Sequence, residues 1–210
     1  MLPKPDSLIF DMDGTLWDAT DTYTKAWNIA YKKLGLEGSM SRERLNYYMG
    51  WEKKKLFADI FPQKSEQERE QIADCIDQIQ DEIIPTEGGK LYDGVVDGLK
   101  ALSEKYKLFI VSNCPKNTIK QMIGFAGIGS YITDEFAHGV NSMPKNHNIR
   151  LLIEKHGLKT PVYVGDTEGD KLQSELTPLP FIFVSYGFGK AEGILNFDSF
   201  VDFSAYFLSL

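Results

Sequence analysis

The chain has 210 residues, of which 42% are hydrophobic and 25% charged, and its formal net charge is −7 at pH 7. This length is enough for one substantial core with room for a small second domain, and the composition is ordinary for a globular protein. The acidic balance argues against nucleic acid or an anionic membrane as the main partner, and the sequence has no apolar run of 18 or more residues.

The first predicted element is a short strand over residues 8–10 that ends in two acids. Asp11 and Asp13 follow it directly, and Gly14 and Thr15 come next. Alternate side chains of an extended chain share a face, so these carboxylates would repel each other unless a cation lay beside them. Oxygen ligands of this kind select magnesium or calcium. Seen alone, the pattern fits a surface turn with two solvated acids about equally well.

From about residue 18 to about residue 88 the sequence predicts helices and no strand. Apolar side chains recur at helical spacing over 27–34. Ser65 and Glu68 have the spacing of a capping box, and they precede a stripe of isoleucines over 72–83. We therefore expect an all-helical insert of three or four helices.

After residue 92, short apolar runs alternate with helical segments. The expected strands are 108–111, 135–137, 161–164 and 181–184, and the expected helices are 95–106, 117–125, 146–156 and 170–176. This alternation is typical of βαβ units and a parallel sheet. The aromatic residues between Phe197 and Phe207 are expected to close the core.

Polar residues follow the strongest of these strands. Ser112 and Asn113 come after one strand, Asp166 and Asp170 come after another, and Lys145 precedes a helix between them. Each signal alone is weak, because Ser-Asn is a common turn and most surface lysines are merely solvated. In a doubly wound sheet these strand ends share one edge. Carboxylates there could hold a metal ion, while a hydroxyl, amides and a lysine could bind phosphate oxygens.

In their order along the chain, these motifs resemble the four motifs of the haloacid dehalogenase superfamily of phosphohydrolases. The segment 11–15 is similar to the first motif, 112–113 to the second, Lys145 to the third, and 165–167 with Asp170 to the fourth. The resemblance covers the whole chain, and the most similar branch includes phosphoglycolate phosphatases and related sugar-phosphate enzymes. Two departures are Asp93, where relatives often have proline, and Pro144 before Lys145, which reverses a common Lys-Pro order.

The resemblance implies an α/β fold with two parts. Residues 1–16 and 90–210 would form a Rossmann-like core, with a parallel sheet of order 3-2-1-4-5 and helices on both faces. Residues 17–89 would form a small all-helical cap domain. In this sheet order strands one and four are neighbours, which would bring Asp11 and Asp166 together.

The resemblance also implies a phosphatase that uses Mg²⁺ and forms an aspartyl phosphate. Asp11 would be the nucleophile, and Asp13 would act first as acid and then as base. The metal would be bound by Asp11, by Asp166 and by the backbone carbonyl of Asp13, with Thr15 and Asp170 supporting the metal site. The substrate phosphate would be bound by Ser112, Asn113 and Lys145.

The expected substrate is a small phosphate ester, similar to phosphoglycolate or to a sugar phosphate. Arg42, Lys53, Lys54 and Lys55 are candidates for binding an acidic leaving group, although each alone is most simply a solvated surface residue. Three aromatic residues of the insert, Tyr47, Tyr48 and Trp51, either line the cap face toward the substrate or form cap core. We expect a monomer or weak homodimer without nucleic-acid or membrane partners.

Two alternatives remain. A phosphomutase similar to β-phosphoglucomutase would use a histidine of the cap, but His138, His147 and His156 all lie outside residues 17–89 and are expected to be ordinary surface or core residues. Thr15 also matches the phosphatases better. A non-catalytic binding protein on the same scaffold would be expected to lose a carboxylate or the lysine. Dehalogenases and phosphonatases lack an acid equivalent to Asp13.

The N-terminal residues and the cysteines favour a cytoplasmic location. Residues 1–6 lack the long apolar region of a signal peptide. The two cysteines, Cys75 and Cys114, fit a reducing compartment and provide no disulfide framework.

Overall fold

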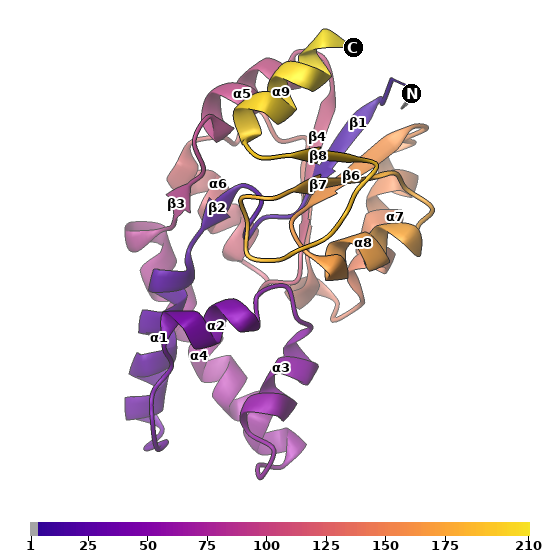
Figure 1. Ribbon diagram of the computed structural model, residues 1–210. Helices are drawn as coiled ribbons and strands as arrows, with labels where there is room; N and C mark the ends of the chain where they lie inside the picture. Colours follow the sequence, from indigo (N-terminus) through magenta and orange to yellow (C-terminus); the bar gives the residue numbers. More distant parts are fainter. Residues whose placement is uncertain (1–3) are drawn as a thin grey trace.

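A parallel six-stranded sheet forms the centre of the computed structural model, which describes residues 4–210 (Figure 1). In spatial order its strands are β5 (Asp134–Ala137), β4 (Lys107–Ser112), β1 (Ser7–Phe10), β6 (Pro161–Gly165), β7 (Phe181–Val184) and β8 (Leu195–Phe197). Counted along the chain, the first five strands have the order 3-2-1-4-5, which confirms the predicted α/β class and strand order. The edge strand β8 was not predicted, because three residues carry too little pattern.

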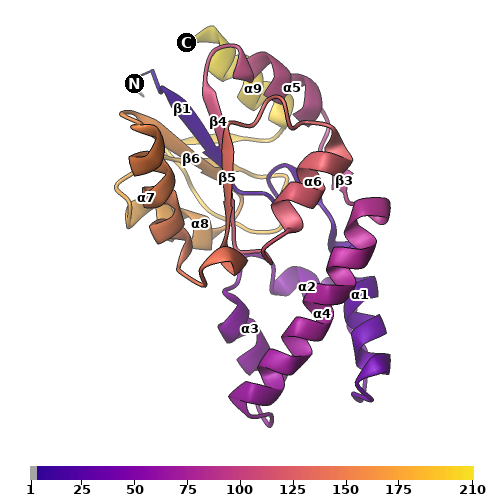
Figure 2. The ribbon, with the colours of Figure 1, turned by 180° about the vertical axis from the view of Figure 1, so that it is seen from behind.

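Helices cover both faces of the sheet, as Figure 1 and the reverse view in Figure 2 show. One face carries α5 (Val95–Ser103), α6 (Thr118–Ala126) and α9 (Phe200–Ser209), and the other carries α7 (Lys145–His156) and α8 (Glu168–Glu175). Leu8 and Phe10 pack with Phe200 on the first face, whereas Ile9 packs with Ile149 on the second. The central strands are therefore apolar on both sides, as parallel sheets require.

Four helices gather beyond the carboxyl ends of the sheet strands (Figure 1). They are α1 (Thr20–Lys33), α2 (Arg42–Tyr47), α3 (Lys53–Ile60) and α4 (Glu66–Glu87). The capping box of Ser65 and Glu68 is present at the start of α4. Trp27 of α1 stacks on Phe57 of α3 with ring centroids 5.2 Å apart, so aromatic packing joins these helices.

A short antiparallel pair, β2 (Trp17–Asp18) and β3 (Lys90–Leu91), connects the four helices to the sheet. These two-residue strands were not predicted, because the sequence pattern of so short a strand is not distinctive. A single 3-10 turn, η1 (His138–Val140), follows β5. No helix in the described part of the chain combines the length and the apolar character that crossing a bilayer requires.

Candidate active site

The strand ends that carry the predicted motifs meet at one edge of the sheet. β1 lies between β4 and β6, and Phe10, its last residue, pairs with Ile110 on one side and Val164 on the other. The backbone N–H of Asp11 donates to the carbonyl of Val164 at 2.8 Å. The loops after these three strands are consequently neighbours, as the topology predicts.

Asp11 is the buried carboxylate at the centre of this edge, with 2% of its surface exposed. Its Oδ2 lies 3.1 Å from Nζ of Lys145, whereas its Oδ1 is buried without a hydrogen-bond partner among the described residues. Burial raises the pKa of Asp11 to about 6, against the opposing effect of Lys145. Asp11 therefore has one oxygen held in place and one oxygen free for a ligand.

Lys145 begins α7 and connects two carboxylates. It is 2% exposed, and its Nζ lies 2.6 Å from Oδ1 of Asp170 in addition to its contact with Asp11. Burial lowers the pKa of Lys145, but the charges of Asp11 and Asp170 outweigh it and hold this pKa well above its usual range. The ammonium group is therefore charged and fixed beside the nucleophile predicted from the sequence.

Asp170 is itself held by the first turn of α8. Its Oδ2 accepts hydrogen bonds from the hydroxyl of Thr167 at 2.6 Å and from the N–H of Thr167 at 3.1 Å, which completes a capping box. Its Oδ1 faces Lys145 and accepts a bond from Tyr163 at 3.3 Å. Both oxygens are thus engaged, which suits a residue that positions Lys145.

Asp166 completes a cluster of carboxylates with Asp11 and Asp170. It is fully buried, and its partners are the hydroxyl of Thr15 at 3.3 Å and the N–H of Phe188 at 2.7 Å. One oxygen from each of the three acids lies within 4.8 Å of the others. Burial, followed by the charges of Asp170 and Asp11, raises the pKa of Asp166 well above its usual range.

This cluster fits a divalent cation. Three buried carboxylates at this distance repel one another, one of their oxygens has no partner, and the donor set is entirely oxygen, which is what magnesium and calcium select. The side chain of Asp13 lies outside the cluster. Its predicted part in metal binding depends on its backbone carbonyl and stays a prediction.

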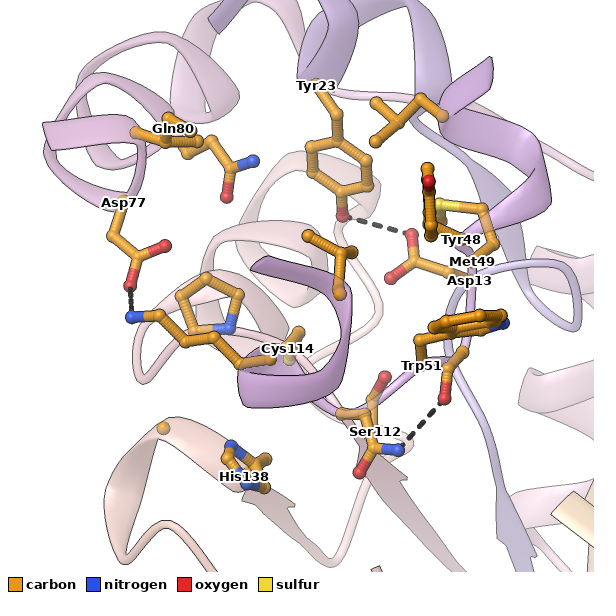
Figure 3. Close-up of a pocket in the computed structure, with 18 of the residues that line it drawn as sticks. Asp13, Tyr23, Tyr48, Met49, Trp51, Asp77, Gln80, Ser112, Cys114 and His138 are labelled. Atoms are coloured by element: carbon orange, nitrogen blue, oxygen red, sulfur yellow. Dashed lines mark hydrogen bonds and ion pairs between the residues drawn. The ribbon is translucent and has the colours of Figure 1, made fainter. Parts of the chain in front are cut away.

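Asp13 points instead toward the four helices. Its Oδ1 accepts hydrogen bonds from Nε1 of Trp17 and from the hydroxyl of Tyr23, each at 3.0 Å. Figure 3 shows the bond from Tyr23. Burial, followed by the nearby charge of Asp11, raises its pKa to about 7. A carboxyl with this pKa can be protonated or ionised near neutral pH, as an acid–base group must be.

Ser112 and Asn113 follow β4 at the same edge. Ser112 is 5% exposed. The side-chain amide of Asn113 donates to the carbonyl of Gly50 at 3.1 Å, a contact that links the sheet edge to the loop between α2 and α3. Asn113 Oδ1 is buried without a partner in the described chain. Both residues line the same cavity as Asp11 and Asp13, while their predicted part in phosphate binding stays a prediction.

The cationic candidates of the helices have different surroundings. Lys53 lines a cavity beside Asp13. Lys55 lies over the ring of Trp51, with Nζ 4.2 Å from the ring centroid. Arg42 pairs with Asp18 and Asp21, and Lys54 pairs with Glu66 in an exposed ion pair, so neither lines that cavity.

Three functional candidates were missed from the sequence. His138, Asp77 and Gln80 line the cavity beside Asp13 (Figure 3), whereas the expectation that all three histidines are ordinary surface or core residues stays a prediction. The sequence did contain a signal for His138. This residue directly follows the weakly predicted strand 135–137, whose carboxyl end lies at the same edge of the sheet. Asp77 and Gln80 gave no comparable signal within a polar helix.

Comparisons with known proteins agree with this geometry. The model of the haloacid dehalogenase-like hydrolases matches residues 8–184. The chain is 26% identical over 212 residues to a phosphoglycolate phosphatase of Rhodobacter capsulatus, covering 95% of this chain and 94% of that protein. It is 27% identical over 189 residues to the probable phosphatase IndB of Dickeya dadantii, covering 86% and 81%. A haloacid dehalogenase-like hydrolase of Streptococcus pneumoniae superposes with a TM-score of 0.85 at 21% identity, covering 97% of this chain and 99% of that one.

Proposed function

We propose that this chain, which belongs to the haloacid dehalogenase-like hydrolase family, is a phosphatase that hydrolyses a small phosphorylated metabolite with the help of Mg²⁺. The observation that carries the proposal is Asp11, whose Oδ2 is held by Lys145 while its Oδ1 is buried and free of a partner. A carboxylate arranged in this way is a suitable nucleophile for forming an aspartyl phosphate. The names of the phosphatase relatives support the same reaction class.

In the first step, the carboxylate of Asp11 attacks phosphorus and the bond from phosphorus to the leaving oxygen breaks. Asp13 transfers its proton to that oxygen, which departs as an alcohol. In the second step, Asp13 takes a proton from water as the water oxygen attacks phosphorus, which releases phosphate and restores Asp11. A pKa of about 7 suits Asp13 to both transfers.

Charge is the main obstacle to the first step. At an effective dielectric near 20, two unit negative charges about 4 Å apart repel by about 4 kcal/mol. Lys145, charged and 3.1 Å from Asp11, offsets part of this repulsion. We assign Ser112 and Asn113 with Lys145 to binding the phosphate oxygens, as donors that do not need to reorganise during transfer.

Asp11, Asp166 and the backbone carbonyl of Asp13 would hold the Mg²⁺ ion, while Asp170 and Thr15 would orient Lys145 and Asp166. When bound, the ion would neutralise charge on the phosphate oxygens. The fit of the carboxylate cluster to an oxygen-selecting cation supports this assignment.

We further propose that residues 17–89 act as the cap over a core made of residues 1–16 and 90–210. The short β2–β3 pair would be the joint, because it contains the two crossings between these parts. Closure would exclude water from the first step and place cap side chains against the leaving group.

The test is release of phosphate from p-nitrophenyl phosphate with Mg²⁺, and its loss on adding EDTA. Asp11→Asn removes the nucleophile, so we expect kcat to fall roughly 10³-fold or more while the thermal unfolding temperature stays close to that of the wild type. A folded Asp11→Asn variant with a near-normal rate would overturn the assignment of the nucleophile. Absence of turnover by the wild-type chain on every ester would favour the binding-protein alternative.

One observation keeps the phosphomutase alternative open. His138 reaches the cavity from the sheet edge, although no histidine lies in residues 17–89. Incubation with a sugar 1-phosphate separates the two functions. A phosphatase releases orthophosphate, whereas a mutase forms the 6-phosphate without releasing it.

A further inference from the structure

The cavity beside Asp13 has the size of a single ring. It lies between the sheet edge and helices α1, α3 and α4, and its volume is about 130 Å³ (Figure 3). A protein cavity of about 150 Å³ accommodates one benzene molecule. A compact group with one six-membered ring therefore fills this cavity, and larger groups such as a whole nucleoside exceed it.

The leaving group belongs in this cavity if the proposed function holds, on which this inference rests. Asp13, the proposed proton donor to the leaving oxygen, lines this cavity. A second hollow, larger and lined by Lys145 and Thr167, lies on the side of the phosphate-binding residues. Asp11, Ser112 and Asn113 also line the cavity beside Asp13, and Asn113 lines both hollows, so we place the phosphoryl group where the two hollows meet.

The walls of the cavity are mostly aromatic and aliphatic, and the hydroxyls of the two tyrosines that line it are already hydrogen-bonded. Aromatic rings come from Tyr23, Trp27, Tyr48, Trp51 and Phe57. The Tyr23 hydroxyl donates to Asp13, and the Tyr48 hydroxyl donates to Asp59 at 2.6 Å. A leaving group with many hydroxyls, such as a hexose, would therefore bury several of them without partners, which is unfavourable.

The cavity has no free positive charge. Among the described residues that line it, Lys53 and His138 are the two that can carry one. Nζ of Lys53 lies 2.7 Å from Oδ2 of Asp77 and 3.8 Å from Oδ1 of Asp74. Burial lowers the pKa of His138, so the imidazole is neutral near pH 7. A carboxylate on the leaving group would find no unpaired cation here.

Gln80 has a buried side-chain oxygen that lacks a partner within the described chain, on the helix side of the cavity. Its side chain is 7% exposed and points into the cavity (Figure 3). Its Oε1 is buried without a hydrogen-bond partner among residues 4–210. A buried carbonyl oxygen left unpaired costs free energy, so a ligand that donates a hydrogen bond to it gains both affinity and orientation.

We propose that the leaving alcohol of the natural substrate is uncharged and consists of one mainly apolar six-membered ring with a hydrogen-bond donor that Gln80 accepts. Asp77 acts as a specificity residue, because it neutralises Lys53 and so disfavours acidic leaving groups. This assignment separates the chain from relatives that are named for phosphoglycolate, whose leaving group is a small carboxylate.

The first experiment compares four alkyl phosphates whose leaving alcohols are similarly basic. They are cyclohexyl phosphate, 4-hydroxycyclohexyl phosphate, 2-phosphoglycolate and glucose 6-phosphate, each with Mg²⁺. We expect kcat/KM for the better cyclohexyl ester to exceed those for 2-phosphoglycolate and glucose 6-phosphate by about 10-fold or more. An active chain that prefers either of the latter overturns the inference alone. No release from any ester overturns the proposed function as well.

The second experiment removes the carboxylate of Asp77 that pairs with Lys53. Asp77→Asn should raise the ratio of kcat/KM for 2-phosphoglycolate over cyclohexyl phosphate about 10-fold, because Lys53 then meets an acidic leaving group. Glu66→Gln is the matched control. It frees Lys54 from an exposed ion pair of 3.0 Å outside the cavity and should leave the ratio unchanged. An unchanged ratio in a folded Asp77→Asn variant would overturn the role of Asp77.

Gln80→Leu provides an independent measurement if Asp77→Asn does not fold. Leucine keeps most of the volume and removes the acceptor. We expect the wild type to prefer 4-hydroxycyclohexyl over cyclohexyl phosphate and the variant to lose this preference. A wild type without this preference, or a variant that retains it, would overturn the role of Gln80.

Discussion

At the residue scale, Gly14 allows the loop after β1 to approach Asp166 closely. Its φ of +83° is left-handed, a conformation that strains any residue with a Cβ by roughly 1–2 kcal/mol. A Cβ there would also overlap Oδ2 of Asp166. We expect Gly14→Ala to reduce the free energy of unfolding by at least this strain and to reduce hydrolysis of p-nitrophenyl phosphate about 100-fold, because Asp166 must move. Denaturant unfolding and steady-state kinetics measure the two effects.

Gly35 is the matched control for this substitution. Its φ is +62°, and a Cβ at this position would meet no atom of the described chain within 4 Å. Gly35→Ala should therefore lose about 1 kcal/mol from backbone strain alone and keep the wild-type rate. If Gly14→Ala were as active as Gly35→Ala, the placement of Asp166 in the site would be wrong.

At the element scale, the start of α4 depends on the charge of Glu68. Its Oε2 accepts hydrogen bonds from the N–H of Ser65 at 2.8 Å and from the Ser65 hydroxyl at 2.9 Å, and its Oε1 lies 3.0 Å from Nζ of Lys64. The backbone bond from Ser65, followed by the contact with Lys64, lowers the pKa of Glu68 from 4.5 to about 2. Since the folded pKa is the lower one, this stabilisation is complete above pH 4.5 and is lost as the pH falls toward 2.

Glu68→Gln isolates that charge, because the amide oxygen can still accept a hydrogen bond. We expect the variant to unfold at a lower temperature than the wild type at pH 7, and the difference to shrink when both are measured at pH 3.5. Glu70→Gln, at an exposed position of the same helix, serves as the control for general charge effects. A difference that is constant between the two pH values would show that the carboxylate has an ordinary pKa.

The fold was predictable where single elements carry strong patterns. The strands β1, β4, β6 and β7 are short apolar runs with buried side chains. The polar residues that follow them in the sequence indicated the edge of the sheet at which these strands end. The pair β2–β3 and the strand β8 have only two or three residues each. Tertiary contacts rather than local pattern determine whether such segments pair, so sequence periodicity could not find them.

The candidate site also contains residues whose positions could be predicted from the sequence and residues whose positions depend on tertiary contacts. Asp11, Lys145 and Asp166 lie together because the strand order brings their loops together, and that order could be predicted. The position of Gln80 depends on how α4 packs against α1 and α6, which no residue spacing within α4 reveals. His138 was accessible in principle through the end of β5, but the strand signal there was weak.

At the scale of the whole molecule, we expect the carboxylate cluster to make stability depend on a divalent cation. The chain already carries a net charge of −7, and folding brings oxygens of Asp11, Asp166 and Asp170 within 4.8 Å of one another. Lys145 offsets part of this repulsion, since its Nζ contacts two of the three acids. The metal-free protein therefore folds against like-charge repulsion that a bound divalent cation would remove.

Thermal unfolding with and without Mg²⁺ measures this dependence. An ion that binds only the folded state at 100 times its Kd stabilises by about 2.7 kcal/mol, so we expect the unfolding temperature of the EDTA-treated wild type to rise by several degrees on adding Mg²⁺. Asp166→Asn should raise the unfolding temperature of the metal-free protein, because it removes a repelling charge, and should abolish the rise with Mg²⁺. Asp97→Asn, at an exposed position of α5, should preserve that rise. An equal rise in Asp166→Asn would show that Mg²⁺ binds elsewhere.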